Sequence, residues 1–166
     1  PAMSNLAKID PGTAVTKPSE LCSPGLWSRL TDTRRGWAEA ARDLAEDPAA
    51  MRELRQVASE LERAIEPCGG QTVIEALAPL LALFNVPRKT EAEAATFWGF
   101  YIDALGSLPA EAVCAGVADY VADAKAEWFP KPGPLKALCE KRAETLRIAV
   151  GRTRKALRWA CPASPP

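Results

Sequence analysis

Apolar residues recur at steps of three and four along most of the chain, which is the spacing of one face of an α-helix. The clearest run follows Asp47-Pro48 and consists of Met51, Leu54, Ala58, Leu61 and Ile65. Aspartate caps the free N–H groups of a first helical turn and proline is tolerated there, so we expect a helix from residue 48 to about Glu66. Its apolar seam is typical of packing in a monomer's core and also fits a dimer contact.

Similar spacing marks the segments on either side of that helix. Upstream, apolar positions predict a helix over residues 27–44 with a break near Gly36. Downstream, they predict a second helix over residues 73–84, after a Gly-Gly turn. Thr90 and Glu93 have capping-box spacing, so the next helix is expected to begin there. A Gly-Ser-Leu-Pro break separates it from the following helix, and we expect the two to pack antiparallel.

A long helix completes the pattern. The stretch from Trp128 to Pro134 has three prolines within five residues, which forbid helix continuation and stiffen the loop. After it, helical spacing runs from about Leu135 to Trp159. No segment alternates between apolar and polar residues as a strand would. We therefore predict an all-α fold, a compact helical bundle with short loops and a long basic C-terminal helix.

The same pattern suggests how the chain is organised. Beyond its first two residues, the segment 1–24 contains three prolines and little apolar periodicity. We therefore expect an irregular leader, and we expect its residues 1–2 to be a cloning remnant. Residues 25–160 form the helical domain, and residues 161–166 a flexible tail. Within the domain, residues 91–160 are expected to form a helical hairpin followed by the basic C-terminal helix.

Composition fits one helical domain in a reducing compartment. The chain has 166 residues, of which 48% are hydrophobic, and this is enough to build a core. No stretch of about 18 apolar residues occurs, so we expect no membrane-spanning helix. Five widely spaced cysteines match neither a disulfide scaffold nor a zinc module, and we expect reduced thiols in a cytoplasm.

No set of residues indicates catalysis. Histidine is absent, which removes the commonest general base and the commonest metal ligand. Acids such as Glu91, Glu93 and Asp103 have ordinary helix-surface spacing, and no glycine-rich phosphate loop is present. We expect no catalytic residues, no cofactor and no metal site, and hence a protein that acts by binding other macromolecules.

Charge is segregated although the chain is neutral overall, with 21 basic and 21 acidic residues. Residues 91–127 contain seven acids and one lysine, whereas residues 131–158 contain nine bases and two acids. A basic helix can neutralise nucleic-acid phosphates. The candidate contacts are Lys141, Arg142, Arg147, Arg152, Arg154, Lys155 and Arg158. The alternative is that these bases balance the neighbouring acids within the molecule.

The order of helices, breaks and aromatics between Tyr101 and Cys139 resembles phage replicative-helicase loaders of the lambda type and the smaller loader and inhibitor proteins of other phages. The resemblance is limited to about residues 98–140. The matching residues are Trp128, Phe129, Pro130, Pro132, Gly133, Leu138 and Cys139. It implies an adaptor of DNA replication, in a phage or prophage setting, that binds a hexameric replicative helicase and places it on single-stranded DNA.

The aromatic loop is the expected partner-binding segment. A stiff loop loses little entropy on binding, which favours an anchor role for Trp128, Phe129, Pro130, Lys131 and Pro132. The alternative is a corner in which both aromatics pack inward. Two other functions remain open: a DNA-binding transcriptional regulator, and an inhibitor or bridging protein that acts through the acidic hairpin. The sequence does not determine the oligomeric state.

Overall fold

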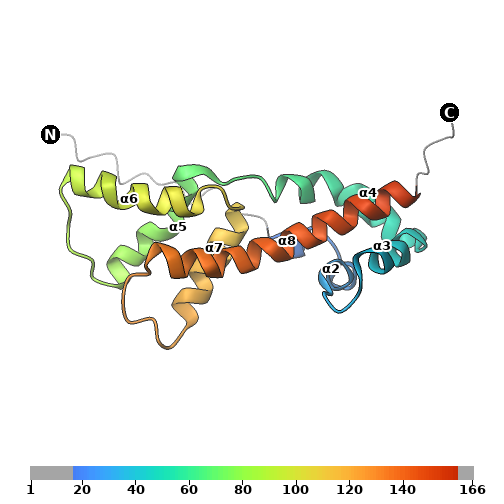
Figure 1. Cartoon of the computed structure of the whole chain (residues 1–166), viewed down its shortest axis with the longest axis horizontal. Helices are drawn as coiled ribbons and strands as arrows, with labels where there is room; N and C mark the ends of the chain where they lie inside the picture. The colour runs from blue at the N-terminus through green and yellow to red at the C-terminus, as the bar shows by residue number, and fades with distance from the viewer. Residues whose placement is uncertain (1–16, 161–166) are drawn as a thin grey trace.

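The computed structural model describes residues 17–160; the expected remnant, most of the leader and the expected tail lie outside the described residues. Within residues 17–160 the chain forms eight α-helices and no strand (Figure 1). They are α1 (Pro18–Leu21), α2 (Pro24–Thr31), α3 (Trp37–Ala45), α4 (Pro48–Arg63), α5 (Gly69–Leu83), α6 (Glu91–Leu105), α7 (Ala110–Ala122) and α8 (Pro132–Ala160). The predicted all-α bundle is confirmed.

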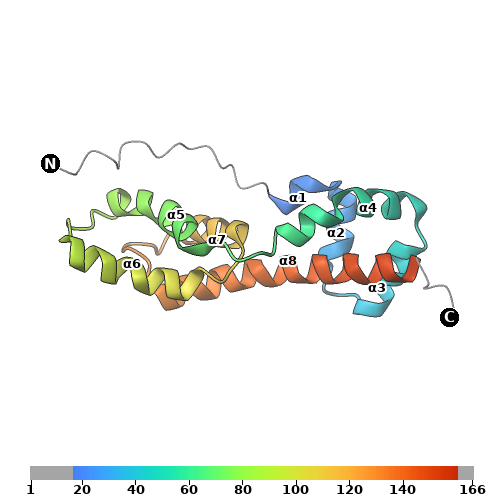
Figure 2. The same cartoon turned by 90° about the horizontal axis from the view of Figure 1, so that it is seen from above.

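Helix α8 is the central helix of the fold and contacts most of the other helices. Its 29 residues span about 43 Å at 1.5 Å per residue, and it runs along the long dimension of the protein (Figures 1 and 2). Its first half packs on α6 and α7, with α5 covering those two, and its second half packs on α2, α3 and α4. Every helix of residues 17–160 is too short or too polar to span a lipid bilayer.

The two halves of α8 belong to two apolar clusters. Leu135, Cys139 and Leu146 lie in the first, together with buried residues of α5, α6 and α7. Val150 and Ala156 lie in the second, with buried residues of α2, α3 and α4. Trp27 and Ile65 contact both clusters. A continuous helix and shared side chains therefore join the two clusters.

The described part of the expected leader is helical, which corrects the prediction of an irregular segment up to residue 24. Residues 18–21 form α1, and α2 begins at Pro24. The Ser23 hydroxyl accepts a hydrogen bond from the N–H of Leu26 at 3.3 Å and caps α2. Proline at the first position of a helix removes only an N–H that has no partner there, so these prolines start helices rather than prevent them.

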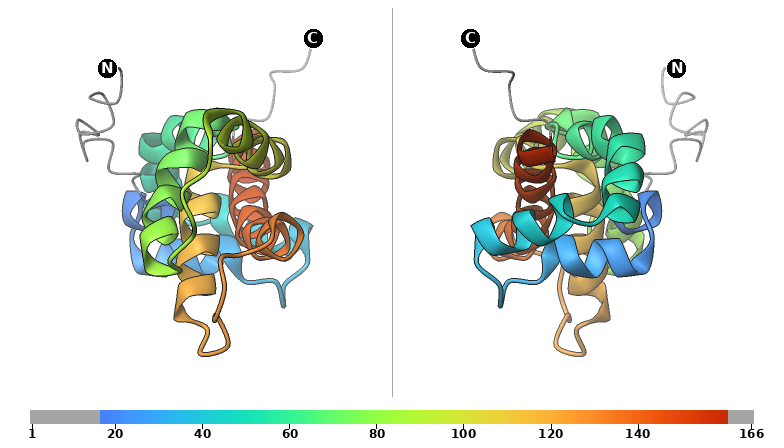
Figure 3. Two further views of the ribbon diagram at one scale, coloured as in Figure 1. Left: turned by 90° about the vertical axis from the view of Figure 1, so that its left-hand side faces the viewer. Right: turned by 90° about the vertical axis from the view of Figure 1, so that its right-hand side faces the viewer.

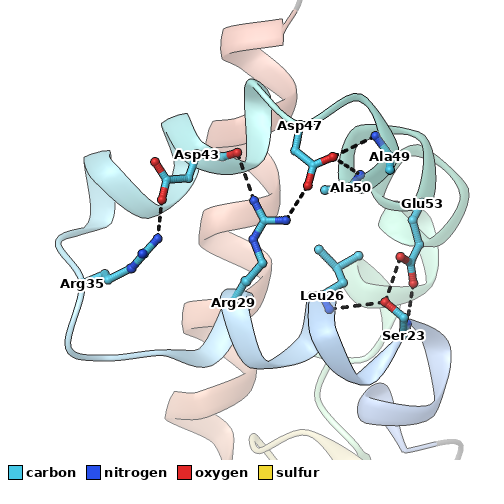
Figure 4. A network of polar contacts seen from close by, with 9 residues as sticks. All are labelled: Ser23, Leu26, Arg29, Arg35, Asp43, Asp47, Ala49, Ala50 and Glu53. Atoms are coloured by element: carbon cyan, nitrogen blue, oxygen red, sulfur yellow. Dashed lines mark hydrogen bonds and ion pairs between the residues drawn. The ribbon is translucent and has the colours of Figure 1, made fainter.

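The predicted break near Gly36 lies between α2 and α3, and a polar network holds it against α4 (Figure 4). Arg29 of α2 donates to Asp47 Oδ2 at 2.7 Å and to the carbonyl oxygen of Asp43 at 3.0 Å. Asp47 also accepts from the first N–H groups of α4, as expected for its cap. Arg29 therefore ties α2 to the end of α3 and the start of α4.

Helices α6 and α7 do not form the expected antiparallel hairpin. The Thr90–Glu93 capping box does open α6. However, α7 packs chiefly on α8 and α5 and crosses α8 steeply (Figures 1 and 3). Gly116 permits this crossing, because a Cβ there would lie 2.9 Å from the Cα of Cys139. The acidic residues of α6 and α7 therefore lie on two helices that do not pack side by side.

Helix α8 begins three residues earlier than expected. Pro132 and Pro134 lie in its first turn, and the N–H of Leu135 donates to the carbonyl oxygen of Lys131 at 3.2 Å. The first-turn N–H groups of a helix have no partner within it, so two prolines cost little there. The loop that precedes α8 therefore ends at residue 131.

Candidate nucleic-acid and protein-binding surfaces

Arg152, one of the seven predicted nucleic-acid contacts, lies inside the protein. Its side chain is 1% exposed. Nη1 donates to the carbonyl oxygens of Arg29 (3.2 Å) and Leu30 (3.0 Å), and Nη2 donates to that of Arg35 (3.0 Å). Arg29 and Leu30 lie in the last turn of α2, where carbonyls have no partner within the helix. The prediction that Arg152 contacts DNA is wrong, because its guanidinium caps α2 instead.

Two further predicted contacts form ion pairs with other helices. Arg142 Nε donates to Asp119 Oδ2 of α7 at 2.7 Å. Arg154 Nε donates to Glu62 Oε1 of α4 at 2.6 Å. Each arginine lowers the pKa of its carboxylate partner, mainly through the hydrogen bond to the charged form. Both pairs fit the alternative in which basic side chains of α8 balance acids of the same molecule.

Four predicted contacts remain at the surface of α8. They are Lys141, Arg147, Lys155 and Arg158. The Lys155 ammonium lies 5.2 Å from the ring centre of Trp159, and Arg147 is 4.0 Å from Glu144. At 100° per residue, Arg147 and Arg158 share one side of α8, whereas Lys141 lies about 120° away. The surface cations of α8 therefore do not form one continuous strip.

The predicted partner-binding loop is held by two tyrosine hydroxyls. Tyr101 of α6 donates to the carbonyl oxygen of Pro130 at 2.6 Å, and Tyr120 of α7 donates to that of Trp128 at 2.7 Å. Pro130 is buried. Burial raises the pKa of Tyr101, so its hydroxyl keeps the proton that it donates. The loop is thereby attached to two helices, which reduces its conformational freedom.

The two aromatics of the loop point in opposite directions. Phe129 packs on Phe97 and Tyr101, with ring centres 5.5 and 5.7 Å away, and on Phe84 at 6.5 Å. Trp128 is 77% exposed, which is the largest fraction among the exposed large apolar side chains of residues 17–160. The corner interpretation thus holds for Phe129, and the anchor interpretation remains available only to Trp128. Lys131 is exposed and Pro132 starts α8.

The end of α5 and the middle of α6 expose large apolar side chains that the spacing of apolar residues did not identify. Leu83 is 57% exposed and Phe100 is 63% exposed. Between these helices, a pocket of about 310 Å³ is lined by Leu81, Ala82, Val86, Pro87, Arg88, Lys89, Ala94, Phe97 and Trp98. Apolar residues occur on most sides of α6, so their spacing alone does not distinguish Phe100 from its neighbours. Only the packing of α5, α7 and α8 distinguishes them.

The acids and cysteines of the described residues form no metal-binding cluster. Within residues 17–160, no group of three or more cysteine, aspartate or glutamate side chains is arranged to hold a metal ion. Glu91, Glu93 and Asp103 are exposed, as expected. Glu93 closes the capping box of α6, and the backbone N–H of Thr90 is the main cause of its lowered pKa. Glu93 therefore has a structural role at the start of α6, and Glu91 and Asp103 lie on the surface of the helix.

No family model, curated protein or solved structure matches this chain.

Proposed function

We propose that this protein is a non-enzymatic adaptor of DNA replication, which binds a hexameric replicative helicase and loads or regulates it on single-stranded DNA in the bacterial cytoplasm. The observation that supports an adaptor is the exposure of Trp128 on a loop held by Tyr101 and Tyr120. Exposed tryptophans on preorganised segments are typical binding hot spots, because burying them costs little ordering entropy. Only the sequence resemblance supports a helicase as the partner.

Two features favour a protein partner over DNA as the principal target. Of the seven candidate DNA contacts, Arg152 is buried, and Arg142 and Arg154 already hold carboxylates. The four remaining cations give single-stranded DNA a weak, secondary site on α8. The same features argue against a transcriptional regulator that relies on this helix. The separation of α6 from α7 argues against an inhibitor that acts through an acidic hairpin.

A binding titration with a purified bacterial hexameric helicase tests the proposal. Trp128→Ala is expected to weaken binding at least tenfold, which is the size of a hot-spot effect. Trp159→Ala is the matched control, since it removes another partly exposed tryptophan at the opposite end of α8 and should change binding less than about threefold. Absence of binding by the unmodified protein would overturn the helicase as partner. If the two substitutions weaken helicase binding equally, the proposal that the Trp128 loop contacts the helicase is overturned.

A salt series with single-stranded DNA tests the secondary site. The affinity for single strands falls with salt at a logarithmic slope of about −0.7 per phosphate contact, so four cations predict a slope no steeper than about −3. Arg158→Ser should reduce that slope by about 0.7. A steeper slope would mean that cations other than these four contact DNA, and the absence of binding would remove DNA from the proposal.

A further inference from the structure

Helix α6 exposes a large apolar side chain next to an open pocket. Phe100 is 63% exposed, whereas Tyr101 and Leu105 of the same helix are buried. A pocket of about 480 Å³ lies beside it and is lined by Lys89, Ala92, Glu93, Thr96, Phe97 and Phe100. Helix α6 lies at the periphery of the bundle (Figures 1 and 2). The exposure of Phe100 shows that its side chain points away from the core. A protruding ring and a hollow thus occupy the same helix face.

The residues of this face are arranged symmetrically about Thr96. Ala92 lies four positions before Thr96, and Phe100 lies four positions after it. At 100° per residue these three positions fall within about 80° of arc, together with Asp103. The face therefore has a small residue, Ala92, at one end and a large residue, Phe100, at the same distance from Thr96 at the other end. If two such faces pack antiparallel, the Phe100 ring of each copy lies opposite the pocket beside Ala92 of the other copy.

Charge follows the same symmetry. Lys89 lies just before α6, seven positions before Thr96, and lines the pocket, whereas Asp103 lies within the helix seven positions after Thr96. Both side chains are exposed, and neither is within 4.0 Å of an oppositely charged group of the described residues. Lys89 rests over the Phe97 ring, 4.9 Å from its centre, which keeps the ammonium at the edge of this face. An antiparallel second copy would bring Lys89 opposite Asp103 twice.

We propose that this face of α6 binds the same face of a second copy, antiparallel, with a twofold axis near Thr96. Such an interface is isologous, so every contact occurs twice. Each Phe100 enters the pocket beside Ala92 of the second copy, and each Lys89 pairs with Asp103 of the second copy. The interface goes beyond the proposed adaptor function, because it involves neither Trp128 nor the basic residues of α8.

The length of the helix sets the strength of this dimer. Fifteen residues span about 22 Å, so one helix pair buries less than the roughly 800 Å² per partner that is usual for stable complexes. We therefore expect a weak dimer with a dissociation constant on the order of 100 μM, in rapid exchange with the monomer. Sedimentation equilibrium over a concentration series, at low salt to preserve the charge pairs, measures it.

Phe100→Asp tests the apolar contact. It places two carboxylates in the apolar centre of the interface and is expected to weaken dimerisation at least tenfold. Leu83→Asp is the matched control, because Leu83 is exposed to a similar extent on α5 and lines no part of this pocket. The control should dimerise within about twofold of the unmodified chain. Helical circular dichroism of both variants checks that the bundle is intact.

A charge exchange tests the register. Lys89→Glu and Asp103→Lys each place like charges opposite one another, and each should weaken dimerisation several-fold at low salt. The double variant restores opposite charges with their signs exchanged and should recover to within about threefold of the unmodified chain. Recovery distinguishes a direct pair from a change in fold or in net charge. The double variant also lacks the Lys89–Phe97 contact, so its recovery would exclude that contact as the cause.

Three outcomes would overturn the proposal. The first is a monomer at every concentration up to about 1 mM, which would leave this face to a different protein. The second is a dimer that Phe100→Asp and Leu83→Asp affect equally, which would place the contact elsewhere. The third is additive weakening by the two charge reversals without recovery in the double variant, which would exclude the antiparallel register about Thr96.

Discussion

Arg152 of α8 donates a hydrogen bond from Nη1 to the carbonyl oxygen of Leu30, 3.0 Å away, although 122 positions separate the two residues in the chain. The guanidinium is buried, and its Nε has no hydrogen-bond partner among the described atoms. A buried charge costs free energy unless polar groups surround it, and here three backbone carbonyls do so. Arg152 is therefore a structural residue that joins the last helix to the α2–α3 connection.

Substitution of Arg152 tests this role. Arg152→Met keeps a long apolar side chain but leaves the buried carbonyl of Leu30 and the partly buried carbonyls of Arg29 and Arg35 without this donor. We expect the free energy of unfolding to fall by about 2–4 kcal/mol, as measured by urea denaturation. Arg158→Met is the control, because Arg158 is exposed and should change stability by less than about 0.5 kcal/mol. Equal losses in the two variants would contradict the structural role.

The crossing of α7 over α8 makes a second prediction. In Gly116→Ala, the new Cβ would lie 2.5 Å from Cys139 Sγ and 2.9 Å from its backbone N, so the helices must separate. We expect a loss of about 1–3 kcal/mol in the free energy of unfolding. Gly25→Ala is the matched control, since its Cβ meets nothing within 4 Å and it lies in the first turn of α2. That variant should be neutral or slightly more stable, because alanine favours helix.

The Arg142–Asp119 pair links α8 to α7 and depends on pH. Hydrogen bonding to Arg142 lowers the pKa of Asp119 below its ordinary value of 3.8. A pKa that is lower in the folded state than in the unfolded state stabilises the protein above pH 3.8, and this contribution is lost as the pH falls through the folded-state pKa. Both side chains are partly exposed, so Asp119→Asn should cost about 0.5 kcal/mol or less at neutral pH.

A pH series of urea denaturation measures that effect. The stability difference between the unmodified chain and Asp119→Asn should be present at pH 7 and should decline as the pH falls below 3.8 and through the folded-state pKa of Asp119. Adding salt at pH 7 should also reduce it, because screening weakens exposed ion pairs. A difference that stays constant across this pH range would show that Asp119 acts through something other than its charge.

The thiol of Cys139 should be unreactive in the folded protein. Burial between α7 and α8 raises its pKa from 9.0 to about 12, so almost none of it is thiolate at pH 8.5. We expect iodoacetamide to modify Cys139 at least about a hundredfold more slowly in the native protein than in urea. Half-buried Cys68 is the internal comparison and should react sooner. Site-resolved mass spectrometry separates the two, and rapid native labelling of Cys139 would contradict its burial.

Local signals in the sequence determined the helices and several of their ends. The Asp47 cap, the Thr90–Glu93 capping box and the break near Gly36 all depend on contacts within a few residues. Such contacts form wherever the chain goes, so reading neighbouring residues is enough to predict them. The same reasoning misjudged residues 17–24, because proline stops a helix in its interior and starts one at its first position.

The tertiary structure decided which side chains are available for binding. Arg152 is buried while Arg158 is exposed, Phe129 points inward while Trp128 points outward, and Phe100 lies outside the core that holds Tyr101. Within each pair the residue type and the helical or loop setting are similar. The difference comes from helices far away in the sequence that pack on one member and not on the other. Periodicity reports that a face is apolar or basic, but only the packing of all the helices determines whether that face is covered.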